Sequence, residues 1–110
     1  MKKIILLISI FFTLFGTSDA NEVNIFSARH YDSDVQLYEK FTHKTGIKVN
    51  VMSGKDKALQ KRIIEEGENC VADLYITADA GRLGAFEEKG MFQKVSSSVL
   101  KKAIPSNFRS

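Results

Sequence analysis

The feature that most constrains the fold is the regular alternation of strand-like and helix-like segments after residue 20. Strand-like runs, which alternate polar and apolar residues or gather apolar ones, occupy residues 22–26, 47–51 and 71–77. A helix-like run follows each of them, and the three runs end at Gly46, Gly67 and Gly90. The order β-α-β-α-β-α with short turns predicts an α/β fold with a mainly parallel sheet and helices on its faces.

The first helix is expected to begin at Asp32-Ser33-Asp34, because these side chains offer N-cap oxygens and acidic groups suit the positive end of a helix. Its apolar stripe is expected to face the core and consists of Val35, Leu37, Tyr38 and Phe41. Asp79 is expected to cap the third helix in the same way.

The N-terminal segment has the pattern of a secretory signal peptide. Lys2 and Lys3 precede an apolar stretch, residues 4–15, and small residues follow up to Ala20. The stretch is shorter than the roughly 20 residues of a membrane span. We therefore predict a signal peptide over residues 1–20 and a mature segment, residues 21–110, that lies outside the cytoplasm and does not span the membrane.

Charge and cysteine usage exclude several classes. The chain carries 16 Lys and Arg against 13 Asp and Glu, a net charge of +3, which gives no electrostatic case for nucleic acid or an anionic membrane surface. Its one cysteine, Cys70, allows no internal disulfide. Cys70 is expected to be a half-buried small apolar group, with a thiolate ligand or an intermolecular bridge as the alternatives. Neither a phosphate-binding loop nor a nucleophile elbow occurs, so we predict no enzymatic activity.

Polar residues follow two of the predicted strands. Arg29, His30 and Tyr31 come after the first strand, and Asp79 and Arg82 come after the third. In open parallel sheets, ligands bind beyond the carboxyl ends of the strands, so both groups are expected at the ligand edge. The second group could hold an anion through Arg82 and the helix N-terminus, or it could be an ordinary helix cap.

The His30-Tyr31 pair suits a hard metal ion. A phenolate is an anionic oxygen ligand that fits ferric iron, and imidazole can add a ring nitrogen. Adjacent residues on an extended strand point in opposite directions, so the pair can share one ion only if the backbone turns between Arg29 and Asp32. The predicted junction between strand and helix supplies that turn. An ordinary hydrogen-bonded loop is the alternative.

Several blocks in order resemble a known family. They are V-N-I-F-S-A-R-H-Y-D-S-D, L-Y-E-K-F-T-x-K-T-G-I-K-V-N, A-D-L-Y-I-T-A-D-A-G-R-L and E-E-K-G-M-F-Q-K-V-S-S-S-V-L-K-K-A-I-P. Together they are similar to the start of the periplasmic ferric-iron-binding proteins of ABC transporters, from Val23 to about Arg109. The resemblance implies part of the first lobe of a two-lobed, transferrin-like solute-binding protein. Such a protein, expected to be a monomer at full length, carries Fe(3+) between its lobes to a permease in the inner membrane.

The resemblance also implies residue roles. His30 and Tyr31 match iron ligands, and Arg29 would be a charge beside the ion or beside a synergistic anion. Tyr38 and Tyr75 match no ligand position and are expected in the core.

The length departs from the family pattern. Members are much longer and take further tyrosine ligands, including an adjacent Tyr-Tyr pair, from later segments, whereas no tyrosine follows Tyr75 here. We therefore expect a truncated chain with part of an iron site. Two alternatives stay open: a periplasmic receptor for an anion or small organic solute held by Arg29 and Arg82, and a secreted remnant or interaction module with no ligand.

Overall fold

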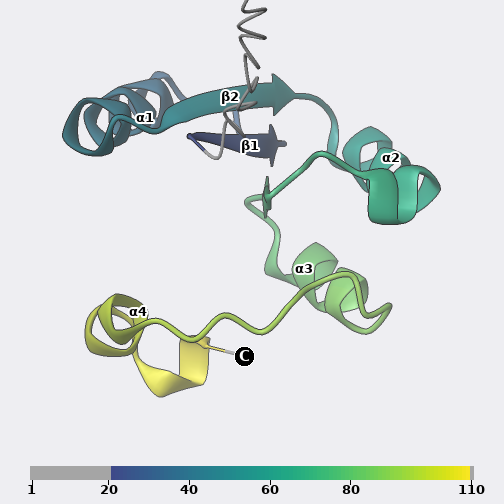
Figure 1. Cartoon of the computed structure of the whole chain (residues 1–110). Helices are drawn as coiled ribbons and strands as arrows, with labels where there is room; N and C mark the ends of the chain where they lie inside the picture. Colours follow the sequence, from purple (N-terminus) through teal and green to yellow (C-terminus); the bar gives the residue numbers. More distant parts are fainter. Residues whose placement is uncertain (1–20, 110) are drawn as a thin grey trace, which may run out of the picture.

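The computed structural model describes residues 21–109 and contains one small parallel sheet with helices around it (Figure 1). The predicted signal peptide, residues 1–20, lies outside the described residues. The strands are β1 (Glu22–Ser27), β2 (Lys48–Ser53) and β3 (Leu74–Ile76). The helices are α1 (Asp32–Thr45), α2 (Asp56–Glu66), α3 (Ala80–Glu87) and α4 (Ser98–Ala103), with short 3-10 turns at Gly67–Asn69 and Ser106–Phe108.

The sheet has the order β2-β1-β3, and both pairings are parallel. β1 pairs with β2 from Glu22 opposite Lys48 to Ser27 opposite Ser53. β3 is shorter than the predicted run of residues 71–77, and it pairs only with the second half of β1. The carboxyl ends of the three strands therefore lie at one edge. The predicted α/β fold with a parallel sheet is confirmed.

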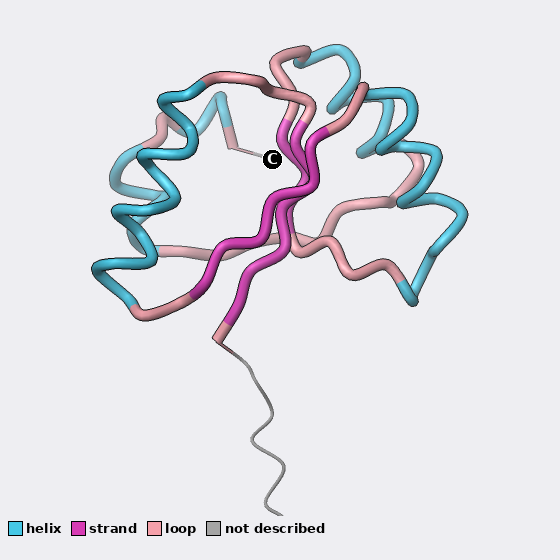
Figure 2. The backbone as a smooth tube through the Cα atoms, turned by 90° about the horizontal axis from the view of Figure 1, so that it is seen from above, coloured by secondary structure: helices cyan, strands magenta, loops and turns pink. Residues whose placement is uncertain are grey.

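The helices lie on both faces of the sheet. Figure 2 shows the strands between α1 on one side and α2 with α3 on the other. The strand order explains this arrangement. The chain moves outward from β1 to β2 and then back across β1 to β3, so two crossovers of the same hand place α1 and α2 on opposite faces.

The buried core lies on the face covered by α2 and α3. Phe26 of β1 packs with Leu59 and Ile63 of α2 and with Phe86 of α3, and all four are at most 9 % exposed. The ring of Phe86 lies 5.6 Å from that of Tyr75 and 5.4 Å from that of Phe92, measured between centroids. These contacts attach α3 to the sheet.

Tyr75 and Cys70 lie at the edge of the core, in agreement with the predictions for both residues. Tyr75 and Cys70 are half-buried and pack against the cluster. The half-buried place of Cys70 is as predicted.

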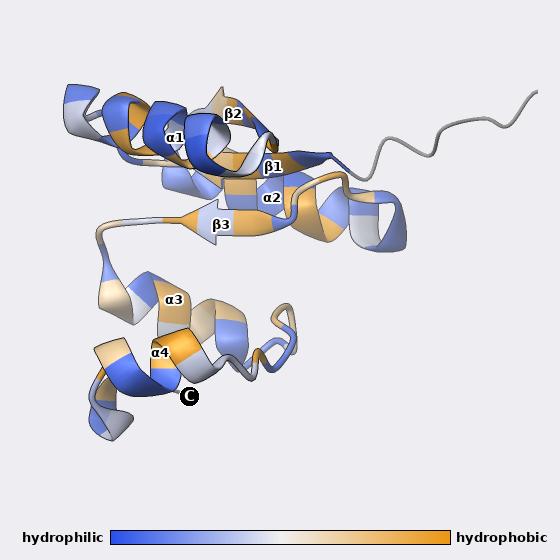
Figure 3. Ribbon diagram, turned by 60° about the vertical axis from the view of Figure 1, so that its left-hand side comes forward, coloured by the Kyte–Doolittle hydropathy of each residue, from blue (hydrophilic) through white to orange (hydrophobic). Residues whose placement is uncertain are grey.

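The first helix differs from the prediction in two ways. α1 begins at Asp32 and has Asp32 and Asp34 in its first turn, as predicted, but Tyr31 occupies the N-cap position and makes no side-chain cap hydrogen bond, so the predicted capping role of Asp32-Ser33-Asp34 is wrong. The apolar stripe is not buried either: Val35 is 55 % exposed and Leu37 62 %, and α1 contains no buried residue. Within residues 21–109, α1 lies on its face of the three-stranded sheet without a second helix packed beside it, so the stripe stays open to solvent. Figure 3 shows how hydrophilic most of α1 is.

The other predicted cap is confirmed. The Asp79 carboxylate accepts a hydrogen bond from the backbone N–H of Arg82 at 3.2 Å and caps α3. After α3 the chain continues to α4, which the sequence pattern did not predict and which Ser97 caps through the N–H of Leu100. Among residues 21–109, no helix has the length and apolar character needed to cross a membrane.

Candidate metal centre

The candidate site lies in the connection between β1 and α1, at the carboxyl edge of the sheet. Ser27, the last residue of β1, is 2 % exposed, and its carbonyl accepts a hydrogen bond from the N–H of Gly54 at 3.1 Å. The N–H of Ala28 donates to the carbonyl of Ile76 at 2.9 Å. The start of the connection is therefore attached to both neighbouring strands.

The side chain of Ser27 also holds the start of the connection. Its hydroxyl accepts from the N–H of Arg29 at 3.1 Å and lies 3.3 Å from the Arg29 carbonyl, to which it can donate. Because Ser27 itself is buried, this contact holds the backbone of Arg29 against the rigid end of the strand.

The Arg29 guanidinium is held by α1. Its Nε donates to one carboxylate oxygen of Asp34 at 3.0 Å, and Nη2 donates to the other at 3.1 Å. This two-point pairing is the strong form of an arginine–carboxylate contact. The pKa of Arg29 is raised, first because of the hydrogen bonds to Asp34. The same guanidinium lies 4.9 Å from the centre of the Tyr31 ring, within the range of a cation–π contact.

His30 and Tyr31 are both exposed, and Tyr31 is 57 % accessible. Tyr31 has extended backbone angles, φ −106° and ψ 132°, and α1 begins at the next residue. No turn or bend occurs in residues 28–31, and the chain changes direction only where α1 begins at Asp32. That His30 and Tyr31 share one ion stays a prediction. In the described part of the chain, no hydrogen bond engages the phenol oxygen or the imidazole. Both donor groups are open to an incoming ion.

These two residues can supply only part of a metal shell. No group of three or more His, Cys, Asp or Glu suited to a metal ion occurs within residues 21–109. An octahedral shell has about six positions, so a phenolate oxygen and an imidazole nitrogen leave most of them to other ligands.

Arg82, the second predicted anion contact, lies at the start of α3 among carboxylates. Its guanidinium pairs with Asp56 at 2.8 Å and with Asp79 at 3.1 Å. Asp56, the first residue of α2, also accepts a hydrogen bond from the hydroxyl of Tyr75, and Gln60 donates to that hydroxyl at 3.2 Å. The structure thus links the starts of α2 and α3 through β3.

The hydrogen bonds of this cluster affect its titration. The Tyr75 hydroxyl, followed by Thr77 and Arg82, lowers the pKa of Asp56 against the effect of burial. Burial, followed by Asp56, raises the pKa of Tyr75. Sequence reasoning missed this cluster because its partners are distant along the chain: Tyr75 is 19 residues from Asp56, and Arg82 is 26.

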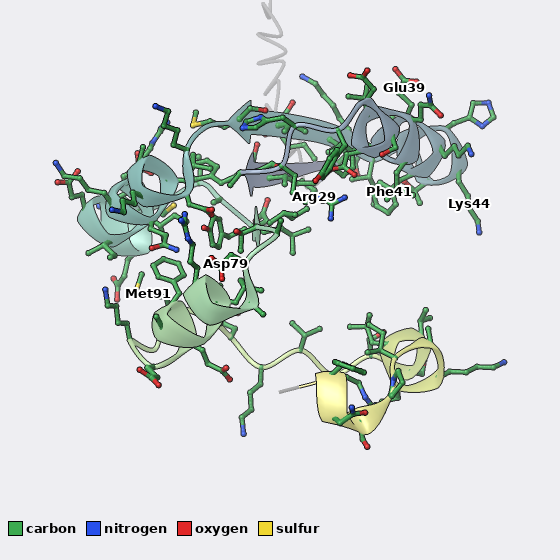
Figure 4. All side chains as sticks on the ribbon, turned by 180° about the vertical axis from the view of Figure 1, so that it is seen from behind. Arg29, Glu39, Phe41, Lys44, Asp79 and Met91 are labelled. Carbon is green, nitrogen blue, oxygen red and sulfur yellow. The ribbon has the colours of Figure 1, made fainter. Side chains whose placement is uncertain are left out.

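The two arginines belong to separate clusters. Arg29 lies beside α1 in Figure 4, whereas Asp79, the partner of Arg82, lies at the start of α3. Each guanidinium is already paired with a carboxylate. In residues 21–109 no ion pair or hydrogen bond joins Arg82 to the Arg29 cluster.

Two hollows of the described surface are lined by residues other than the predicted ligands. A groove of about 610 Å³ follows β3 and the chain after α3, with Leu74, Tyr75, Met91 and Phe92 in its walls. A second hollow of about 400 Å³ is formed by the segment around α4. His30 and Tyr31 lie at an open edge instead, where access does not depend on a pocket.

The parallel sheet, with metal-donor side chains at the carboxyl end of its central strand, defines an α/β protein with a candidate ligand site at the strand ends. The chain is 47 % identical over 92 residues to iron uptake protein A1 of Synechocystis. The aligned region covers 84 % of this chain and 26 % of that protein. Its homologues are bacterial iron-uptake and ferric-iron-binding proteins. No protein-family model matches the chain.

Solved structures agree with this relationship. The chain superposes on the Trichodesmium protein FutA (IdiA), solved in complex with iron and citrate ligands, with a TM-score of 0.76 and 50 % identity over 81 % of this chain. It superposes equally well, with a TM-score of 0.76 and 44 % identity over 80 % of this chain, on a ferric-binding protein from Campylobacter jejuni. The matched part is 28 % of each of those chains, so this chain spans about a quarter of the relatives that it matches.

Proposed function

We propose that this chain supplies part of a ferric-iron site, with Tyr31 and His30 as iron ligands. The observation that carries the proposal is the exposure of both donors, which are adjacent in the chain, just after the carboxyl end of β1. The relationship to iron-binding relatives supports iron as the ion. In this proposal the chain binds and delivers iron and catalyses no reaction.

The chemistry of the two donors determines how iron binds. Tyr31 coordinates as phenolate and His30 through a neutral ring nitrogen, so iron uptake releases protons and weakens at low pH. Water or an accompanying anion completes the shell, because this chain supplies two donors there. Citrate has the carboxylate oxygens that such a role needs, and it accompanies iron in the Trichodesmium structure.

We place this activity in the periplasm, where the chain passes iron to an ABC permease in the inner membrane. The charged start, apolar stretch and small-residue end of residues 1–20 support export. The iron-uptake relatives support the transport role.

The test is an iron titration of the purified chain with ferric citrate, followed by visible absorption. A phenolate bound to ferric iron gives a charge-transfer band, which we expect in the wild type and which Tyr31→Phe should lose. Tyr38→Phe is the matched control because it removes the hydroxyl of a half-buried tyrosine on α1. If Tyr31→Phe kept both the band and the affinity of the wild type, the ligand assignment would be wrong.

An anion or organic-solute receptor is less well supported. Its two expected cationic contacts, Arg29 and Arg82, each pair with a carboxylate, which competes with an anionic ligand. Calorimetry with citrate alone, against citrate with iron, separates the two functions: heat from iron-free citrate would favour the receptor. Metal analysis that finds no iron after loading, together with silent calorimetry, would favour an interaction module.

A further inference from the structure

We infer, on the basis of the proposed ferric site, that Asp34 is a positioning residue for the iron ligand Tyr31 and that it acts through Arg29. Asp34 lies in the first turn of α1, three residues after Tyr31, and is a predicted helix cap rather than a predicted site residue. Asp34 contacts the main chain of Tyr31 directly and the Tyr31 ring through Arg29.

The backbone of Asp34 holds the backbone of Tyr31. The N–H of Asp34 donates to the carbonyl of Tyr31 at 3.0 Å, which fixes the point where the extended connection turns into the helix. The direction in which the phenol leaves the main chain therefore depends on the first turn of α1.

The side chain of Asp34 holds the ring of Tyr31 indirectly. Its two carboxylate oxygens accept from Nε and Nη2 of Arg29, so the guanidinium plane cannot rotate without breaking a hydrogen bond. The guanidinium carbon lies 4.9 Å from the centre of the Tyr31 ring. The Asp34 side chain is 17 % exposed and that of Arg29 is 35 % exposed, so the carboxylate is the better shielded partner of the pair.

An exposed tyrosine ring would otherwise sample several rotamers. Tyr31 is 57 % exposed and has no hydrogen bond from its hydroxyl within the described residues, and the guanidinium lies against its ring and restricts it. Ordering one free side chain on binding weakens affinity by about two- to tenfold. Because Asp34 fixes Arg29 and Arg29 contacts the ring, Tyr31 is already ordered before iron binds and this loss of affinity is avoided. The same contact keeps a positive charge beside the phenolate.

The first measurement is the iron titration in Asp34→Asn, which keeps the shape of the side chain and removes its charge. We expect about two- to tenfold weaker iron binding and a shifted charge-transfer band. The matched control is Asp32→Asn, an exposed acidic residue in the same turn that makes no ion pair within residues 21–109; it should behave as the wild type. In Arg29→Met, adding Asp34→Asn should change nothing further, because the path between Asp34 and the ring is already broken.

The second measurement needs no iron and uses NMR of the same chain. A guanidinium over an aromatic ring brings its neighbouring methylene protons under the ring current, so the δ protons of Arg29 should be shifted upfield in the wild type and in Asp32→Asn. The shift should disappear in Asp34→Asn. If Asp34→Asn and Asp32→Asn gave the same Arg29 shifts, or the same iron affinity and band position, the positioning role of Asp34 would be refuted. Absence of any iron band in the wild type would instead refute the proposed function, while the NMR result still decides the role of Asp34.

Discussion

Phe86 should be the residue on which the attachment of α3 to the sheet depends most. It is 2 % exposed and packs against Phe26, Tyr75 and Phe92, while it is the one buried residue of α3. Truncation of a buried phenylalanine to alanine costs about 3–5 kcal/mol through lost transfer energy and the cavity that remains. A chain of this size has a free energy of unfolding of about 4–13 kcal/mol, so Phe86→Ala should remove a large part of it.

The assay is equilibrium unfolding in urea, followed by circular dichroism. Phe86→Leu, expected to lose about 1–2 kcal/mol, keeps the effect measurable if the alanine variant does not fold. The control is Phe108→Ala, because Phe108 is 76 % exposed and its truncation should change stability by less than about 0.5 kcal/mol. Equal losses for Phe86→Ala and Phe108→Ala would refute the core assignment.

Two further predictions concern stability. The hydrogen bond from Tyr75 lowers the pKa of Asp56, so the contribution of ionised Asp56 to the free energy of unfolding is present above about pH 4 and is lost as the pH falls through the lower, folded-state pKa. Tyr75→Phe should therefore reduce the pH dependence of stability, which acid unfolding followed by circular dichroism measures. An unchanged acid profile would contradict this assignment. A side chain at Gly54 would meet Leu59 at 3.1 Å, whereas one at Gly84, inside α3, meets nothing within 4 Å. Thermal melts should therefore show Gly54→Ala destabilised by about 1 kcal/mol and Gly84→Ala stabilised by about 0.5–1 kcal/mol, and the opposite order would contradict the packing described around α2.

The parts of the fold that follow local rules could be predicted from the sequence. Alternation of strands and helices implies parallel pairing, because parallel strands need a long crossover, and parallel pairing puts Arg29 and Arg82 after strands that end at one edge. The cap at Asp79 depends on contacts only three residues apart, which the sequence displays directly.

Other features depend on tertiary packing between elements that are distant in the sequence. An apolar stripe shows which face of α1 is hydrophobic, but only the surrounding elements decide whether Val35 and Leu37 become buried. The Asp56 cluster joins residues whose proximity follows from tertiary packing alone. Asp34 is an intermediate case. Its position at the start of a helix is visible in the sequence and predicts a helix cap, whereas its pairing with Arg29 depends on how the connection between β1 and α1 folds back.

The central place of β1 has a consequence for how the chain acquires its structure during synthesis. β1 emerges first, yet its neighbours on both sides come later, and Phe26 is covered only when α2 and then Phe86 have been made. Contacts between segments so distant in the chain form slowly, because the intervening loop must close first. A growing chain therefore exposes the strand that becomes most buried for most of its elongation, which makes Ile25 and Phe26 the natural binding point for a holding chaperone before folding is complete.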